Sequence, residues 1–105
     1  MIENISSQEE VILLAAGSMP EGAYAYGLQN EIKDQLDQNW SLGTIHTILY
    51  RLESKGLLRS EMGGASEKRG GRSKRLYKLT AKGFQNLDFI QSSRQNMWSK
   101  IKPSF

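Results

Sequence analysis

Apolar residues recur with a helical spacing through the first half of the chain. Residues 11–16 form a short apolar run that predicts a mostly buried helix. Ser6 or Ser7 can open this helix through a capping box with a glutamate three residues later. Two glycines and a proline within residues 17–22 end it, because both residue types disfavour a helix interior.

Two further helices are predicted. The second runs from about Tyr24 to Asp37, where an apolar residue recurs at every fourth position. This stripe consists of Tyr24, Leu28, Ile32 and Leu36. The third helix begins after Ser41, a favourable N-cap residue, and Gly56 is placed to end it in a left-handed conformation. Its predicted core face consists of Leu42, Ile45, Ile48, Leu49 and Leu52.

The hydrophobic pattern changes after Gly56. Residues 57–62 and 75–79 predict two strands, and the glycine-rich segment between them is too long for a tight turn. Thr80 can cap a final helix that runs to about Lys102, where Pro103 discourages extension. We therefore predict a mainly α fold with a small two-stranded β-wing. A winged helix-turn-helix would span residues 1–80, and a long C-terminal helix would span residues 81–105.

The composition is that of one small globular domain. The chain has 105 residues, of which 38% are hydrophobic, and this suits a single modest core. Cysteine is absent, which excludes disulfides and thiolate metal sites and agrees with a reducing cytosol. No apolar run approaches the roughly 18 residues of a membrane span, and no signal peptide is visible. We expect a cytoplasmic protein.

Charge is distributed unevenly along the chain. Residues 1–40 carry seven acids and one base, a net charge of −6, whereas residues 41–105 carry thirteen bases and four acids, a net charge of +9. A basic half of this kind predicts a polyanionic partner such as nucleic acid. Chance clustering on a solvated surface is the alternative.

The third helix has a second face that suits contacts with DNA bases. A recognition helix needs one face held by the domain and another that reaches into a groove. Arginine can read guanine, threonine can contact a thymine methyl group, and tyrosine can reach phosphate or base. The candidate DNA-binding residues of this helix are Ser41, Thr44, His46, Thr47, Tyr50 and Arg51. An ordinary amphipathic surface helix is the alternative interpretation.

The loop between the predicted strands combines glycines with a cluster of cations. Its candidate DNA-binding residues are Lys68, Arg69, Arg72 and Lys74. Cationic groups there would meet phosphates or enter a minor groove, and the glycines would let the backbone follow the DNA surface closely. For the loop by itself, a solvated basic hairpin without a partner is the alternative.

The last helix has apolar residues at alternating spacings of three and four, the rhythm of a coiled coil. The rest of this small domain cannot bury the whole stripe. We therefore predict a homodimer held by this helix. The candidate interface residues are Leu87, Ile90, Arg94, Met97, Trp98 and Ile101. Packing against the first helix of the same chain is an alternative that can coexist with dimerisation.

Several motifs follow one another at the spacing of a known family. Tyr26-Gly27-Leu28 resembles G-Y-x-[IL], and residues 41–53 resemble S-x-G-T-[IL]-Y-x-x-L-x-R-L-E. Residues 56–58 resemble G-[LI]-[IL], and residues 71–80 resemble the wing signature G-R-x-x-x-Y-Y-x-L-T, which Lys82-Gly83 completes. Over about residues 10–84 the chain therefore resembles the PadR family of winged-helix transcriptional regulators.

The resemblance implies a repressor of the family's short subgroup, which carries one C-terminal dimerisation helix. The third helix and the wing would contact double-stranded DNA, and two-fold symmetry would make the operator pseudo-palindromic. Some relatives bind flat aromatic compounds between the two C-terminal helices, so a small aromatic effector is a candidate partner. His46 stands where the family usually has tyrosine, which points to a different operator, and Leu76 replaces the first aromatic residue of the wing pair.

Two other functions remain as alternatives. One is a ligand-sensing regulator that binds aromatic compounds at the dimer interface. The other is a protein-interaction adaptor that uses the winged-helix fold without DNA, which the basic face of the third helix disfavours. One histidine, no cysteine and scattered carboxylates provide no nucleophile–base pair or metal cluster. We therefore expect no enzymatic activity, no cofactor and no metal site.

Overall fold

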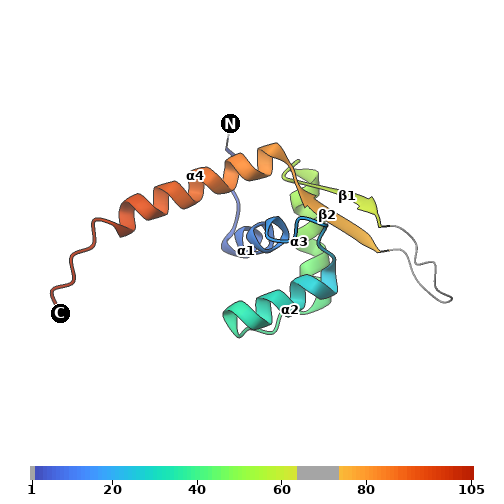
Figure 1. Cartoon of the computed structure of the whole chain (residues 1–105), viewed down its shortest axis with the longest axis horizontal. Coiled ribbons are helices and arrows are strands. Elements are labelled where there is room, and N and C mark those ends of the chain that lie inside the picture. Colours follow the sequence, from blue (N-terminus) through green and yellow to red (C-terminus); the bar gives the residue numbers. More distant parts are fainter. Residues whose placement is uncertain (1, 64–73) are drawn as a thin grey trace.

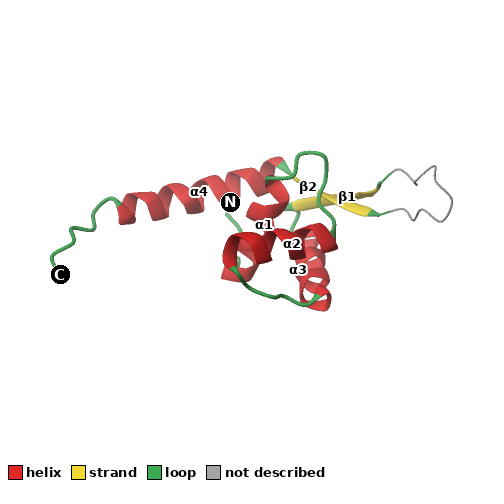
Figure 2. Cartoon of the chain, turned by 60° about the horizontal axis from the view of Figure 1, so that its bottom comes forward, coloured by secondary structure: helices red, strands yellow, loops and turns green. Residues whose placement is uncertain are grey.

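The computed structural model describes residues 2–63 and 74–105, and it confirms the predicted order of helices and strands. Four helices surround one core, and a two-stranded sheet projects from one end of the helical body (Figures 1 and 2). The elements are α1 (Ser7–Gly17), α2 (Ala25–Leu36), α3 (Leu42–Ser54), β1 (Leu58–Met62), β2 (Arg75–Leu79) and α4 (Ala81–Trp98).

The ends of two helices differ from the prediction. α2 starts one residue after Tyr24 and ends at Leu36, because Asp37 adopts a left-handed conformation with φ of 54°. α4 ends at Trp98 and not at Lys102, so Ile101 lies outside the helix. Among residues 2–63 and 74–105, no helix or strand lies beside the last turn of α4, and isolated helical turns are marginal in water. The long-helix prediction was therefore wrong by about one turn.

The core lies where α1, α2, α3 and the sheet meet. Its fully buried side chains include Ile12 and Leu13 of α1, Leu28 of α2, and Leu49 of α3. The predicted N-terminal caps are confirmed, because the side chains of Ser6, Ser41 and Thr80 each accept a backbone N–H of the helix that follows. Gly56 follows α3 with φ of 77°, as predicted for a left-handed helix end.

The sheet is antiparallel and gains a partner that the sequence did not predict. Leu58 pairs with Leu79 at one end and Met62 pairs with Arg75 at the other. In addition, Ala23, in the connection between α1 and α2, exchanges two backbone hydrogen bonds with Tyr77, of 2.9 and 2.7 Å. Strand β2 is thus hydrogen-bonded to β1 on one side and to Ala23 on the other.

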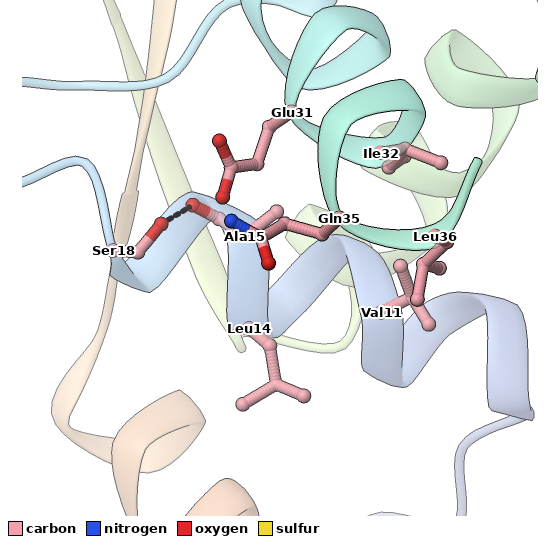
Figure 3. Close-up of a pocket in the computed structure, with 8 residues that line it drawn as sticks. All are labelled: Val11, Leu14, Ala15, Ser18, Glu31, Ile32, Gln35 and Leu36. Carbon is pink, nitrogen blue, oxygen red and sulfur yellow. Dashed lines mark hydrogen bonds between the residues drawn. The ribbon is translucent and has the colours of Figure 1, made fainter. Parts of the chain in front are cut away.

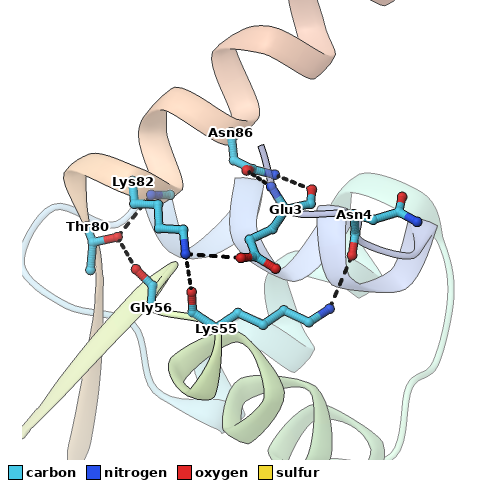
Figure 4. Close-up of polar contacts among 8 residues, drawn as sticks. Glu3, Asn4, Lys55, Gly56, Thr80, Lys82 and Asn86 are labelled. Atoms are coloured by element: carbon cyan, nitrogen blue, oxygen red, sulfur yellow. Dashed lines mark hydrogen bonds and ion pairs between the residues drawn. The ribbon is translucent and has the colours of Figure 1, made fainter. Parts of the chain in front are cut away.

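A polar cluster joins the N-terminal segment, the end of α3 and the start of α4 (Figure 4). The ammonium group of Lys82 donates to the backbone oxygen of Lys55 at 2.9 Å and contacts a carboxylate oxygen of Glu3 at 3.1 Å. The buried side chain of Asn86 exchanges two hydrogen bonds with the backbone of Glu3. Thr80 donates its hydroxyl to the oxygen of Gly56 at 2.7 Å. These contacts set the direction in which α4 leaves the body.

Gly83 lets α4 approach the start of β1 closely. A Cβ atom at this position would overlap the backbone oxygen of Leu57 and lie 2.9 Å from a methyl group of Leu79. Such contacts cannot be accommodated without a shift of backbone. The glycine is therefore required by packing at the first turn of α4.

Glu9 closes the capping box of α1 and also contacts the end of α3. Its carboxylate accepts the backbone N–H of Ser6 at 2.8 Å and lies 3.1 Å from the ammonium group of Lys55. Burial by itself raises the pKa of Glu9, but these hydrogen bonds and the positive charge of Lys55 outweigh burial and hold the pKa below its ordinary value. The pair fixes α1 against the C-terminal end of α3.

Candidate nucleic-acid interface

The N-terminus of α3 is fixed by its own first residues. The hydroxyl of Ser41 accepts the backbone N–H of Thr44 at 3.0 Å and donates to the hydroxyl of Thr44 at 2.9 Å. Both were predicted to bind DNA, and both lie on the solvent side of the helix end. Their hydroxyl oxygens can still accept or donate further hydrogen bonds at the surface.

α3 presents two distinct faces. Ile45, Ile48, Leu49 and Leu52 are buried as predicted. The predicted DNA-binding residues His46, Thr47, Tyr50 and Arg51 are all exposed, with Tyr50 72% exposed. The buried face holds the helix rigidly, so the exposed side chains are carried on a fixed element.

Leu42 does not belong to the core face, although the sequence placed it there. It is 41% exposed, because it sits on the first turn of α3 beyond the edge of the helical body. There it lines a surface hollow of about 390 Å³ together with Tyr24, Ala25, Tyr26, His46, Arg75 and Tyr77. This hollow joins the start of α2, the outer face of α3 and the wing.

A second depression brings several predicted residues together. Ser41, Thr44, Thr47 and Arg51 line it, along with Gly43, Ile48 and Gln8 of α1. Thr47 donates its hydroxyl to the backbone oxygen of Gly43 at 3.0 Å. Arg51 forms no ion pair with any described residue, and nearby Glu53 instead accepts the hydroxyl of Ser60. The guanidinium of Arg51 is therefore available at this surface.

Three of the four predicted wing residues, Lys68, Arg69 and Arg72, lie outside the described residues. The fourth, Lys74, precedes β2 and is exposed. Its ammonium nitrogen lies 4.1 Å from the centre of the Tyr24 ring, within the range of a cation–π contact. Lys74 thus stands beside the hollow at the start of α2.

The wing is tied to α3 through side chains. Arg75 donates to the hydroxyl of Ser60 at 2.9 Å, and Ser60 donates to the carboxylate of Glu53 at 2.6 Å. Burial raises the pKa of Tyr77, and the negative charge of Glu53 adds to this effect while Arg75 opposes it. The phenol of Tyr77 therefore stays protonated at neutral pH.

The predicted dimer residues fall into two groups. Leu87 is buried in the core of its own chain, and Arg94 donates to the carboxylate of Glu10 at 2.7 Å. Ile90 is half-buried, whereas Met97, Trp98 and Ile101 are exposed. The alternative of packing against α1 is therefore confirmed for α4 as far as Arg94, and the dimer interface stays a prediction.

Sequence reasoning did not assign Tyr26 or Leu42 to the candidate interface, although both line the hollow beside it. Tyr26 is 58% exposed and belongs to the motif at the start of α2. Its position outside the apolar stripe of α2 was the signal for exposure. Leu42 lies on the apolar spacing of α3, so the pattern assigned it to the core.

Two absences apply to the part of the chain that the structure describes. Among residues 2–63 and 74–105, His, Asp and Glu side chains do not gather in any group of three or more that could hold a metal ion. Within the same residues, no helix has the length and apolarity needed to cross a bilayer.

Comparison with known proteins gives a family match over most of the chain. Residues 12–88 match the transcriptional regulator PadR-like family. No curated protein matches the chain significantly.

Solved structures with the same fold include three named regulators. A PadR-like transcription factor from Bacteroides fragilis is 28% identical, with a TM-score of 0.73 over 88% of this chain and 84% of that one. A PadR-like transcriptional regulator from Bacillus cereus is 23% identical, with a TM-score of 0.64 over 90% of this chain and 93% of that one. Bacillus subtilis PadR, solved in complex with operator DNA, is 20% identical, with a TM-score of 0.65 over 95% of this chain and 51% of that one.

Proposed function

The chain belongs to the PadR-like family of transcriptional regulators, and we propose that it represses transcription by binding a pseudo-palindromic operator as a homodimer. The observation that carries this proposal is the outer face of α3. Its polar and aromatic side chains are exposed and rigidly mounted, next to the base of a basic wing. The family comprises regulators and not enzymes, which accords with the scattered titratable groups.

The α3 side chains suit a major groove. Thr47, Tyr50 and Arg51 stand on a helix whose opposite face is buried, so the backbone that carries them is held in place before DNA arrives. Arginine and threonine can distinguish base pairs in the major groove. Bacillus subtilis PadR, which shares this fold, was solved with operator DNA, and this supports the same use of the fold here. We infer sequence-specific binding through this helix.

The wing would supply general affinity. Lys68, Arg69, Arg72 and Lys74 lie within seven consecutive residues of the sequence. Of these, Lys74 is described, and it contacts the ring of Tyr24, which lines the hollow between α2 and α3. Cations near phosphates release counterions, so this contribution would not depend strongly on base sequence. We propose that residues 1–80 hold both contacts with DNA and that the protein acts in the cytoplasm, where its operator would lie.

The homodimer rests on the C-terminal half of α4. Met97 and Trp98 are 64% and 69% exposed, and an apolar stripe of this kind usually has a partner. Residues 81–105 would therefore provide the dimer contacts. Sedimentation at micromolar concentration measures this assembly, and a monomer there would contradict it.

A second role is favoured by the exposed Trp98. An indole ring at a dimer interface offers a flat surface on which an aromatic effector could stack. Quenching of tryptophan fluorescence by planar aromatic compounds, compared between wild type and Trp98→Ala, tests this role. Equal quenching in both proteins would argue against it.

The DNA-binding proposal is tested by separating base reading from general affinity. Operator and scrambled duplexes are titrated with each variant at about 50 and 200 mM salt. Thr47→Ala and Tyr50→Ala should weaken operator binding by about 1–3 kcal/mol and scrambled DNA much less. The double variant Arg72→Ala with Lys74→Ala should weaken both duplexes equally and reduce the salt slope by about one unit per lost contact. The reverse outcome would exchange the two roles, and a flat salt response would favour the adaptor function.

A further inference from the structure

An apolar groove lies between α1 and α2 on the surface of the helical body (Figure 3). It has a volume of about 210 Å³. The lining residues are Val11, Leu14, Ala15 and Ser18 of α1 and the segment after it, and Glu31, Ile32, Gln35 and Leu36 of α2. Leu14 and Leu36 are 41% and 42% exposed at its edges. Two half-exposed leucines beside an apolar floor indicate a surface whose burial by another polypeptide segment would be favourable in free energy.

The size of the groove selects its occupant. Pockets for small-molecule ligands usually measure about 300–1,000 Å³, so this groove is too small for most of them. Its volume instead suits one or two apolar side chains of a polypeptide. The hydroxyl of Ser18 is already satisfied, because it donates to the backbone oxygen of Ala15 at 2.7 Å. A partner of this groove would therefore bind mainly through apolar contacts.

The segment after α4, residues 99–105, has matching features. Ile101 is 56% exposed and Phe105 is fully exposed. Beyond its one-turn start the segment has no regular structure, and Pro103 favours an extended conformation for the residue before it. In an extended strand, alternate side chains point to opposite sides, so Ile101 can enter a groove while the long side chains of Lys100 and Lys102 bend back to its rim.

The charges of the groove and of the segment are complementary. Glu31 stands at the groove and forms no ion pair with any described residue. The sequence after Asp88 contains no acidic residue and three bases, of which Lys100 and Lys102 flank Ile101. An apolar side chain between two lysines thus meets an apolar groove with an acid on its rim. Opposite charges at such a rim favour the correct partner and register.

A chain cannot easily fill its own groove. α1 contacts both α2 and α4, and Figure 1 shows α2 and α4 on opposite sides of α1. The C-terminal half of α4 and the segment after it lead away from the body in both views (Figures 1 and 2). A return to the groove between α1 and α2 would require α4 to break, so the segment is positioned to reach another molecule.

We propose that the groove between α1 and α2 receives residues 99–105 of a second copy, with Ile101 inserted and the flanking lysines beside Glu31. This inference rests on the proposed homodimer and names a contact beyond its helical seam. Two-fold symmetry makes the contact reciprocal, so each dimer contains it twice. Because α2 leads directly into α3, the contact sets the spacing of the two α3 helices in the dimer.

A cysteine pair tests the contact directly, because the chain has no cysteine of its own. Leu36→Cys combined with Ile101→Cys should give a covalent dimer under mild oxidation, several-fold faster than the matched pair Asn30→Cys with Ile101→Cys. Asn30 is exposed on the opposite face of α2. Adding Glu31→Lys should slow the reaction several-fold at low salt.

The outcomes separate this inference from the homodimer itself. A dimer in sedimentation that forms no disulfide, or that links Asn30→Cys equally fast, would overturn the groove contact and leave the homodimer intact. A disulfide within one chain would overturn the second copy as occupant. A monomer in sedimentation would overturn both proposals.

A second measurement avoids any change in the groove. The variant Ile101→Cys is spin-labelled and mixed with ¹⁵N-labelled wild-type protein that carries no spin label. In mixed dimers, the spin label should broaden the amide signals of Leu14 and Leu36 of the ¹⁵N-labelled protomer. Broadening confined to α4 would contradict the proposal.

Discussion

α3 and α4 are both amphipathic in sequence, but they divide their surfaces in different directions. In α3 the division runs around the helix, because Leu49 is fully buried while the adjacent Tyr50 is exposed. In α4 the division runs along the helix, because Leu87 near the start of α4 is buried whereas Met97 near the end of α4 is exposed. The comparison shows that apolar spacing indicates a face, whereas the length of the body decides how much of that face is covered.

The sharpest test of the division in α3 uses its two adjacent residues. Leu49→Ala should lower the free energy of unfolding by about 2–5 kcal/mol, because it leaves a cavity in the core. Tyr50→Ala should change it by less than about 0.5 kcal/mol, because the ring contributes little to the packed core. Urea unfolding of both variants measures the difference. Equal destabilisation would show that the two faces are not separate.

The packed half of α4 is tested at Gly83. Gly83→Ala should destabilise the fold by about 1–3 kcal/mol, because the added methyl group overlaps the backbone of Leu57. Gly43→Ala is the matched control in α3, where a Cβ would approach only the hydroxyl of Ser41, at 3.9 Å. That control should gain about 0.5–1 kcal/mol from the helix preference of alanine. If thermal unfolding ranks the two variants in the opposite order, the close approach of α4 to β1 is wrong.

The smallest expected effect concerns the carboxylate that joins α1 to the end of α3. Because the pKa of Glu9 is lowered in the folded protein, its stabilisation is present above its unfolded pKa and is lost as pH falls through the folded value. The free energy of unfolding should be about 1 kcal/mol higher for wild type than for Glu9→Gln at neutral pH. This difference should disappear in acid. Unfolding from pH 7 to pH 3 measures it, with Glu21→Gln as an exposed control. A gap that widens in acid would reverse the assigned shift.

Local signals in the sequence predicted most of the fold. Ser41 and Thr80 marked the starts of helices, Gly56 marked an end, and the four buried residues of α3 followed from their spacing. Those features depend on neighbouring residues, so a sequence contains them directly. The outer face of α3 was predictable for the same reason, because it is the complement of the buried face.

Features that depend on distant contacts were missed. Leu42 has the spacing of a core residue, but it is 41% exposed because the described residues cover the first turn of α3 only in part. Arg94 fits a helical seam, yet it pairs with Glu10 of α1, 84 residues away in sequence. The bridge between Ala23 and Tyr77 joins two segments whose proximity follows only from the assembled fold. The spacing of apolar residues does not show how far along a helix a neighbouring element covers it.

The chain of hydrogen bonds from Arg75 through Ser60 to Glu53 has a mechanical consequence for the proposed complex. Together with the bridge at Ala23, it makes α3 and the base of the wing one stiff unit. In the proposed complex, such a unit would fix the separation between the groove that α3 enters and the DNA backbone beside the base of the wing. DNA whose grooves do not match must bend or twist to fit, and the energy of that deformation depends on base steps that the protein never touches. Stiffness in the protein thus becomes a preference for flexible DNA.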